Sequence, residues 1–161
     1  MGNMIKIGMA ELNVCLPPDA ITTLGLGSCV GVVLYDPVKK VCGMVHVMLP
    51  DSTKIKNNEN RAKFADTGID QLINELKTAG ADIKSLTAKI AGGAQMFSFT
   101  GSSDLTKVGD RNVEATIQKL QTLKIPILAS DTGKNYGRTI VFSPETGMLQ
   151  IKAVGKEISY I

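Results

Sequence analysis

Residues 23–50 constrain the fold of this chain more than any other stretch. They read TLGLGSCVGVVLYDPVKKVCGMVHVMLP, with two apolar, β-prone runs on either side of Asp36-Pro37-Val38-Lys39. Proline at the second position of a turn presets φ, and the aspartate before it can accept hydrogen bonds from the following backbone. We therefore predict that these two runs, which lie between Cys29 and His46, form a β-hairpin.

This hairpin carries Cys29 and His46, and His46 is the only histidine in 161 residues. If a two-residue loop at 37–38 closes the hairpin, Cys29 lies directly opposite His46. Opposed side chains in an antiparallel pair are roughly 4.5–5.5 Å apart at Cβ, so a thiol and an imidazole can meet there. A longer loop changes the register, and a shift of one residue sends the two side chains to opposite faces.

The other face of the hairpin is predicted to be core. It consists of alternate apolar residues, namely Val30, Val32, Leu34, Val45, Val47 and Leu49. The face that carries Cys29 and His46 is expected to be covered only in part, by loops.

Length and composition predict one soluble domain spanning residues 1–161. Hydrophobic residues make up 43% of the chain and charged residues 20%, which is ordinary for a globular protein. A net charge of +3, with 4% aromatic residues and no tryptophan, argues against a nucleic-acid partner. Three cysteines, at 15, 29 and 42, do not form a disulfide framework and favour a reducing cytoplasm.

Membrane insertion and secretion are not indicated. No apolar run approaches the ~18 residues that a membrane-spanning helix needs. The N-terminal residues lack the charged start and unbroken apolar core of a signal peptide.

Periodicity predicts two main helices, at 61–79 and 109–123, with Asn60 as the cap of the first and Gly80 as its stop. A polar loop is expected at 51–60 and another loop at 102–107. Beside the hairpin, further strands are predicted at 4–9, 11–16, 20–24, 86–91, 125–129, 139–142, 148–153 and 157–161. This order predicts an α/β fold: a mixed, largely antiparallel sheet sandwich with two main helices packed on it.

Cys29 and His46 have the chemistry of a nucleophile and its base. A thiolate is the reactive form of cysteine, and a neighbouring imidazole can generate it. The alternative is a buried cysteine acting as a small hydrophobic residue beside a core histidine. A buried imidazole needs polar partners, which favours a functional histidine on this apolar strand.

The neighbouring residues suggest supporting roles. Gly25 and Gly27 allow close approach of a substrate, and the amide N–H groups around Gly27 and Ser28 can face a developing oxyanion. A Cys–His pair usually has a third group that holds the ring. Thr23 is one possible partner, although it also fits as an ordinary strand residue.

Other candidate sites are weaker. Cys15, Cys29, Cys42 and His46 could supply four zinc ligands, but the chain has no CxxC motif. The run Gly25-Leu26-Gly27 does not continue into a phosphate-binding GxGxxG, and no helix follows it. The polar loop around Asp131 and Arg138 could contact a substrate, but ordinary turn chemistry explains it better. Gly92-Gly93 is read in the same way, with close approach of another backbone segment as the second explanation.

The motif TLGLGSC at 23–29 with His46 downstream resembles the signature of the chemoreceptor glutamine deamidases, the CheD family. Further segments resemble this family in the same order: HVMLPDS at 46–52, FADTGI at 64–69, KIAGGAQMF at 89–97, VGDRNVEA at 108–115 and DTGKN at 131–135. The resemblance covers essentially the whole chain. One departure is Lys134, which stands where the family commonly has glycine.

The resemblance implies a sandwich fold and a papain-like mechanism that needs no cofactor. It assigns Cys29 as nucleophile, His46 as general base and acid, and Thr23 as the group that orients the imidazole. The implied substrates are glutamines in the cytoplasmic helices of chemoreceptors, and the usual partner is the CheC phosphatase. The alternative function is a non-catalytic module that binds such a signalling partner.

Overall fold

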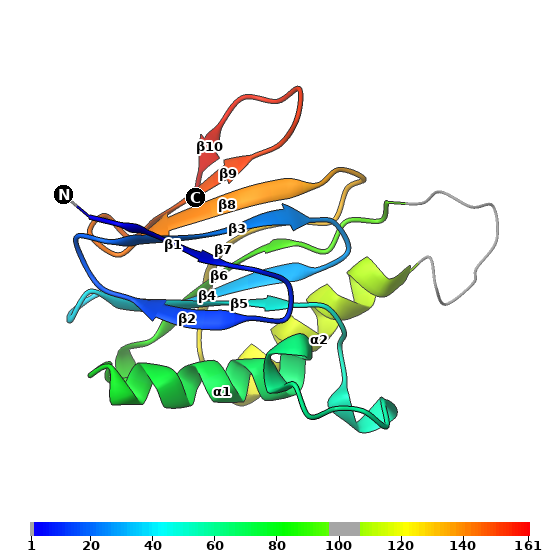
Figure 1. Cartoon of the computed structure of the whole chain (residues 1–161), viewed down its shortest axis with the longest axis horizontal. Coiled ribbons are helices and arrows are strands. Elements are labelled where there is room, and N and C mark those ends of the chain that lie inside the picture. Colours follow the sequence, from blue (N-terminus) through cyan, green and yellow to red (C-terminus); the bar gives the residue numbers. More distant parts are fainter. Residues whose placement is uncertain (1, 97–106) are drawn as a thin grey trace.

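The computed structural model describes residues 2–96 and 107–161 and has three layers. Two five-stranded sheets face each other, and both helices cover the outer face of the second sheet (Figure 1). The predicted loop at 102–107 lies, apart from Lys107, outside the described residues. No helix in the described part of the chain is long and apolar enough to cross a membrane.

The first sheet has the order β1-β3-β8-β9-β10. Its strands are β1 (Met4–Ile7), β3 (Ala20–Leu26), β8 (Arg138–Ser143), β9 (Met148–Lys152) and β10 (Ser159–Tyr160). Only β1 and β3 run parallel among these neighbours.

The second sheet has the order β2-β5-β4-β6-β7. Its strands are β2 (Leu12–Cys15), β5 (Val41–Val47), β4 (Val30–Asp36), β6 (Thr87–Gly92) and β7 (Ile127–Thr132). Its one parallel pair is β6 with β7. The predicted fold class, a mixed and largely antiparallel sandwich with two helices, is confirmed.

The first helix begins later than predicted. Asn60 does act as a cap, but its side chain accepts a hydrogen bond from Ala62 N–H and caps a short 3-10 turn, Arg61–Lys63. Helix α1 then spans Ala65–Thr78, and Gly80, with φ of 99°, follows its end as predicted. Helix α2 spans Val108–Thr122, close to the prediction. Two more 3-10 turns lie at Ser52–Lys54 and Ile83–Ser85.

The predicted hairpin is present, but its loop is longer than two residues. Asp36 pairs with Val41, so four residues, 37–40, form the loop. Asp36 accepts hydrogen bonds from the backbone of the loop, as its chemistry predicts. The register shifts by two residues relative to the prediction, and a shift of two keeps every side chain on its expected face.

Strand β3 also continues further than predicted, through Gly25 to Leu26. Thr23 pairs with Ile140 and Leu26 pairs with Arg138, so β3 contains one extra residue at this point. Gly25 accommodates this bulge with φ of 67°. The extra residue turns the side chain of Leu26 inward, where it is fully buried.

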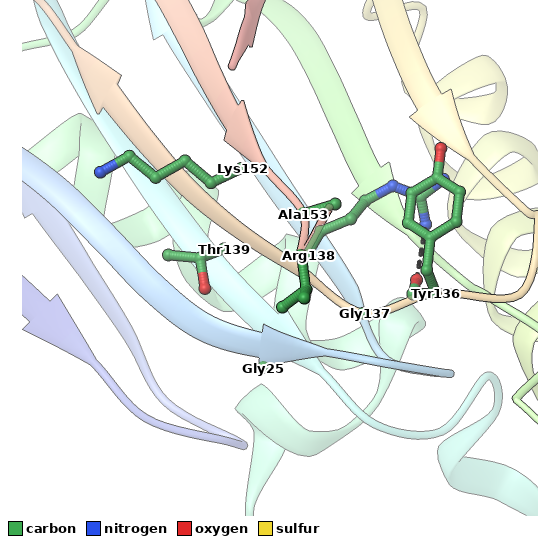
Figure 2. Close-up of a pocket in the computed structure, with 8 residues that line it drawn as sticks. Gly25, Tyr136, Gly137, Arg138, Thr139, Lys152 and Ala153 are labelled. Atoms are coloured by element: carbon green, nitrogen blue, oxygen red, sulfur yellow. Dashed lines mark hydrogen bonds between the residues drawn. The ribbon is translucent and has the colours of Figure 1, made fainter. Parts of the chain in front are cut away.

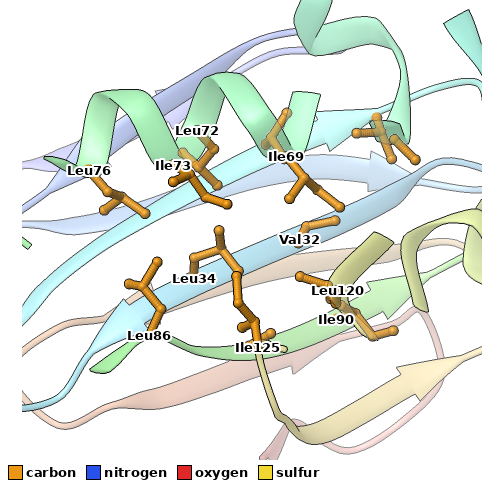
Figure 3. Packing of buried hydrophobic residues seen from close by; sticks show 14 of the residues in the cluster. Val32, Leu34, Ile69, Leu72, Ile73, Leu76, Leu86, Ile90, Leu120 and Ile125 are labelled. Atoms are coloured by element: carbon orange, nitrogen blue, oxygen red, sulfur yellow. The ribbon is translucent and has the colours of Figure 1, made fainter. Parts of the chain in front are cut away.

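Each face of the second sheet covers a separate apolar core. Val30, Val32 and Leu34 of β4 pack against α1 and α2, which confirms the predicted core face (Figure 3). The opposite face packs against the first sheet. The expectation that only loops cover the face of His46 is therefore wrong: a complete sheet covers it, and His46 is fully buried.

Candidate functional site

Residues 27–29, here called the crossing turn, carry the chain from β3 in the first sheet to β4 in the second. Each of the three carbonyl groups in this turn accepts one hydrogen bond. The donors are Ala94 N–H to Gly27 (2.8 Å), Asn112 Nδ2 to Ser28 (2.9 Å) and Gly93 N–H to Cys29 (2.8 Å). The turn is therefore held along its whole length by residues that lie distant in the sequence.

His46 lies on β5 and faces the first sheet. Its Nδ1 is 2.7 Å from Thr23 Oγ1, and the same hydroxyl donates to the carbonyl of Ile7 at 2.9 Å. A hydroxyl has one proton, so Thr23 accepts the hydrogen bond from His46 Nδ1–H. The ring is thereby held as the tautomer whose Nε2 carries a lone pair, and no described residue bonds Nε2.

Cys29 and His46 do not lie directly opposite each other as predicted. Gly31 is the residue opposite His46, and Cys29 comes two residues before Gly31. Cys29 lies one residue before β4 begins, and its packing against the core between the sheets places it on the face that carries His46, diagonal to that residue. Cys29 is partly buried and packs against the core between the sheets. Gly31 itself has no side chain, and a Cβ there would lie 2.6 Å from Ile140 Cδ1 and 3.2 Å from Leu26 Cδ1, so these two side chains fill the space beside it.

Burial shifts both ionisable groups toward their neutral forms. It lowers the pKa of His46 below its ordinary value of 6.5. It raises the pKa of the Cys29 thiol above 9.0, although the N–H of Cys29 itself acts in the opposite direction. At neutral pH the resting pair is therefore a thiol and a neutral imidazole.

The other two cysteines lie elsewhere. Cys15 and Cys42 are direct cross-strand partners on β2 and β5, both are free thiols, and both are fully buried. The structure does not gather the four potential zinc ligands: within residues 2–96 and 107–161, no group of three or more His, Cys, Asp or Glu side chains could hold a metal ion.

The 131–138 loop is held together by its own contacts. Arg138 is buried, stacks on the Tyr136 ring at 4.6 Å, donates to the Gly133 carbonyl at 3.0 Å and lies 3.4 Å from Asp131. Lys134 adopts a left-handed φ of 64°, a conformation that favours glycine. These contacts agree with the turn chemistry that the sequence predicts for this loop.

Gly92 and Gly93 approach the crossing turn closely. A Cβ on Gly92 would lie 2.3 Å from the carbonyl oxygen of Cys29, and the φ of Gly92 is 107°. The second explanation for this glycine pair, close approach of backbone, is therefore correct.

Sequence reasoning missed Asn112. This fully buried residue on α2 donates to the carbonyls of both Ser28 and Met48, at 2.9 and 3.0 Å. The sequence spacing could have indicated that Asn112 is buried. Asn112, Thr116 and Leu120 follow one another at intervals of four residues, and all three lie on the buried face of α2. A polar side chain on an inward-facing stripe needs buried partners.

A depression of about 510 Å³ lies at the ends of β3, β8 and β9 (Figure 2). Its lining consists of Gly25, Tyr136, Gly137, Arg138, Thr139, Lys152, Ala153 and Val154. None of Thr23, Cys29 and His46 lines it, so it is separate from the Thr23–His46 pair.

Comparison with known proteins places the chain in a family. The family model described as "CheD chemotactic sensory transduction" matches residues 48–153, more than half of the chain. A protein of Lachnoclostridium phytofermentans named "Probable chemoreceptor glutamine deamidase CheD" is 72% identical over 156 residues, 97% of each chain.

Two relatives carry the name "Chemoreceptor glutamine deamidase CheD". The protein of Halalkalibacterium halodurans is 59% identical over 155 residues, 96% of each chain. The protein of Bacillus subtilis is 51% identical over 152 residues, which cover 94% of this chain and 92% of the relative. The chain therefore belongs to the CheD family of chemotactic sensory transduction proteins.

Proposed function

We propose that this protein is a protein-glutamine glutaminase that hydrolyses glutamine side chains in chemoreceptors to glutamate. The names of its relatives support this activity. The observation that carries the proposal is the hydrogen bond between Thr23 and His46 Nδ1, which fixes the tautomer of the ring. The other ring nitrogen, Nε2, has no partner among the described residues, and His46 shares a face with Cys29. We propose that residues 1–161 form one deamidase domain.

In the first half of the reaction, Cys29 is the nucleophile. His46 Nε2 accepts the thiol proton as the sulfur attacks the side-chain carbonyl carbon of glutamine. Amide N–H groups of the crossing turn, from Gly27 and Ser28 to Cys29, stabilise the oxyanion of the tetrahedral intermediate. The C–N bond then breaks, the imidazolium returns its proton to the leaving nitrogen, and ammonia departs from a thioester.

In the second half, water replaces ammonia. His46 takes a proton from the water as its oxygen attacks the thioester carbonyl. The C–S bond breaks, the sulfur leaves and regains a proton from His46, and the carboxylic acid that forms releases its proton to the solvent to give glutamate. Thr23 keeps the ring in one tautomer throughout, so the same nitrogen handles each proton. The receptor helix gains one negative charge at each site.

The neutral resting state of the pair fits this sequence. The thiol keeps its proton until a substrate carbonyl is in place, so proton transfer and attack are coupled. A buried thiolate without a substrate would carry a desolvation cost.

The decisive experiment is mass spectrometry of chemoreceptor cytoplasmic fragments incubated with the protein, together with ammonia release. We expect the mass increase of deamidation at particular glutamines, and Cys29→Ala should abolish it. The matched controls Cys15→Ala and Cys42→Ala should retain activity, because Cys42 pairs with Cys15 and with Tyr35, near the end of β4 that is distant from the crossing turn. Deamidation by Cys29→Ala at the wild-type rate would refute the assignment of the nucleophile.

We further propose that the protein acts in the cytoplasm and that a CheC-type phosphatase is its partner. Both proposals rest on the family. Co-purification of the two proteins tests the partnership, and mapping of the interface would show whether the partner covers the crossing turn. A partner that binds while receptors stay unmodified would favour the alternative function, a non-catalytic binding module.

A further inference from the structure

Asn112 lies where the hydrogen-bond ladder between β4 and β5 ends. The last pair of this ladder is Val30 with Val47, and beyond it the two strands separate. The backbone N–H groups of Met48 and Leu49 bond to Lys63 instead of to the crossing turn. The amide of Asn112 lies in the resulting gap and donates to the carbonyls of Ser28 and Met48.

The bond to Ser28 also fixes the peptide group between Ser28 and Cys29. In a planar trans peptide, the C=O and the N–H point in opposite directions. Because Asn112 holds the Ser28 carbonyl on the side of α2, the N–H of Cys29 faces away from α2. The Gly27 carbonyl is held by Ala94 N–H, so the N–H of Ser28 is likewise constrained.

The three donors to the crossing turn, namely the N–H groups of Gly93 and Ala94 and the side chain of Asn112, lie together on the side of α2. A Cβ on Gly109, in the first turn of α2, would lie 2.4 Å from the Ala94 carbonyl and 2.6 Å from that of Gly93, so α2 packs directly on these residues. Gly93, Ala94 and Asn112 therefore draw the carbonyls toward α2. The N–H groups of Ser28 and Cys29, which follow the held carbonyls of Gly27 and Ser28, are therefore presented on the other side.

The environment of the thiol agrees with this geometry. The N–H of Cys29 favours the thiolate form of its own side chain, which places this N–H close to Sγ. Apart from its own Sγ, no described residue accepts a hydrogen bond from it. An N–H group beside the attacking sulfur, with no other acceptor among the described residues, is suited to bind the oxyanion that forms after attack.

We propose that Asn112 is a positioning residue: by binding the Ser28 carbonyl, it aims the Cys29 N–H, together with that of Ser28, at the oxyanion of the tetrahedral intermediate. The chemistry of this inference rests on the proposed function. The inference narrows the oxyanion donors of the crossing turn to two amide groups, the N–H groups of Ser28 and Cys29. The Oδ1 of Asn112, which has no described partner, takes no part in it.

A merely structural Asn112 would satisfy two buried carbonyls and nothing more. Its loss would then lower stability but leave the chemistry of the folded protein unchanged. Two readouts separate the roles: the pH profile of Cys29 alkylation, and the division of any activity loss between kcat and KM. Both are measured under conditions where the variant is folded.

The test compares Asn112→Ala and Asn112→Ser with Thr116→Ala. Thr116 lies one turn further on the same buried face of α2, and its hydroxyl has no described hydrogen-bond partner, so it controls for general disturbance of the helix. Asn112→Ser keeps one hydroxyl donor and removes less volume, which provides a second variant if Asn112→Ala does not fold.

With iodoacetamide as the probe, the alkylation midpoint of Cys29 should move to higher pH in Asn112→Ala, because the freed peptide no longer holds N–H beside the thiolate. Deamidation kcat should fall about 10- to 100-fold, less than the 10²–10³ attributed to complete loss of one oxyanion donor, with KM nearly unchanged. The alkylation midpoint and the kcat of Asn112→Ser should lie between those of Asn112→Ala and those of the wild type. Thr116→Ala should match the wild type in both readouts.

An unchanged alkylation midpoint in the folded Asn112 variants would overturn the inference. An equal shift in Thr116→Ala would also overturn it, since the effect would then belong to the helix as a whole. Alkylation needs no receptor, so failure of wild-type protein to release ammonia would reject the proposed function while leaving this arm of the test intact.

Discussion

At the scale of single residues, Thr23 has one hydroxyl proton and two polar neighbours. The proton goes to the carbonyl of Ile7, so the oxygen is left to accept from His46. The Ile7 carbonyl thereby decides which way the hydroxyl points, and the hydroxyl decides which nitrogen of the ring carries hydrogen. A backbone group of β1 thus sets the tautomer of a side chain in the other sheet.

Replacement of Thr23 by valine should therefore impair the chemistry more than binding. Valine keeps the shape but leaves the Ile7 carbonyl and His46 Nδ1–H without their partner, so the ring loses its fixed tautomer. We expect kcat to fall about 10- to 100-fold, below the 10²–10⁴-fold that general acid–base catalysis supplies, with a smaller change in KM. Nitrogen NMR of His46 should show hydrogen on Nδ1 in the wild type and a mixture in the variant.

Thr23→Ser is the matched control, because serine keeps the hydroxyl and loses only a methyl group. It should retain most of the activity and the Nδ1–H tautomer. If the valine variant were as active as the serine variant, the hydroxyl would have no part in the reaction.

At the scale of elements, β6 ends at Gly92 and Gly93 follows it, and these two glycines allow the crossing turn to pack directly against the end of the strand. Gly92→Ala should disturb the turn in two ways. Its φ of 107° is unfavourable for alanine by roughly 1–2 kcal/mol, and the new Cβ would meet the Cys29 carbonyl at 2.3 Å. We expect lower stability by urea denaturation and a marked loss of ammonia release.

Gly80→Ala isolates the first of these effects. Gly80 has a similar φ of 99°, but nothing lies within 4 Å of its Cβ position, and it is remote from the crossing turn at the end of α1. This variant should lose stability without losing activity per folded molecule. Equal losses in both variants, in stability and in activity, would show that the contact with Cys29 is unimportant.

The elements also show how far the sequence predicts the fold. Alternation placed the core face of β4 correctly, and face assignment survived the error in the register because the hairpin loop grew by two residues. The start of α1 was misplaced because Asn60 caps a 3-10 turn rather than the helix itself. Local signals such as caps and turn residues identify an element but do not fix its length.

The residues of the candidate site also differ in how far the sequence reveals them. Cys29 and His46 are conspicuous in the sequence because of their chemistry, whereas Asn112 acts through carbonyl groups that no side-chain pattern reveals. The covering of His46 by the first sheet depends on contacts between strands far apart in the chain. Lys134 shows a further limit: a lysine adopts the left-handed conformation that the sequence pattern reserves for glycine.

At the scale of the whole molecule, the candidate site exists only where the two sheets meet. Thr23 comes from the first sheet, His46 from the second, and Cys29 from the turn that joins them. Separation of the sheets would expose His46 to water and remove its partner. The free energy of unfolding should therefore carry a signature of this single histidine.

That signature is a loss of stability in mild acid. Burial lowers the pKa of His46 in the folded protein, so below its ordinary pKa of 6.5 the unfolded chain binds a proton that the folded protein does not. The free energy of unfolding should thus decrease as the pH falls from about 6.5 toward 5, by at most about 1.4 kcal/mol per pH unit. Urea denaturation at several pH values measures this slope.

His46→Gln should flatten the slope, because the chain has no other histidine and Asp36, whose pKa is lowered from 3.8, affects stability only at lower pH. Both proteins should then lose stability together as Asp36 protonates below that range. A variant with the same slope as the wild type between pH 6.5 and 5 would mean that His46 is protonated as easily in the folded protein as in the unfolded chain. Such a result would contradict the closed packing of the two sheets around the ring.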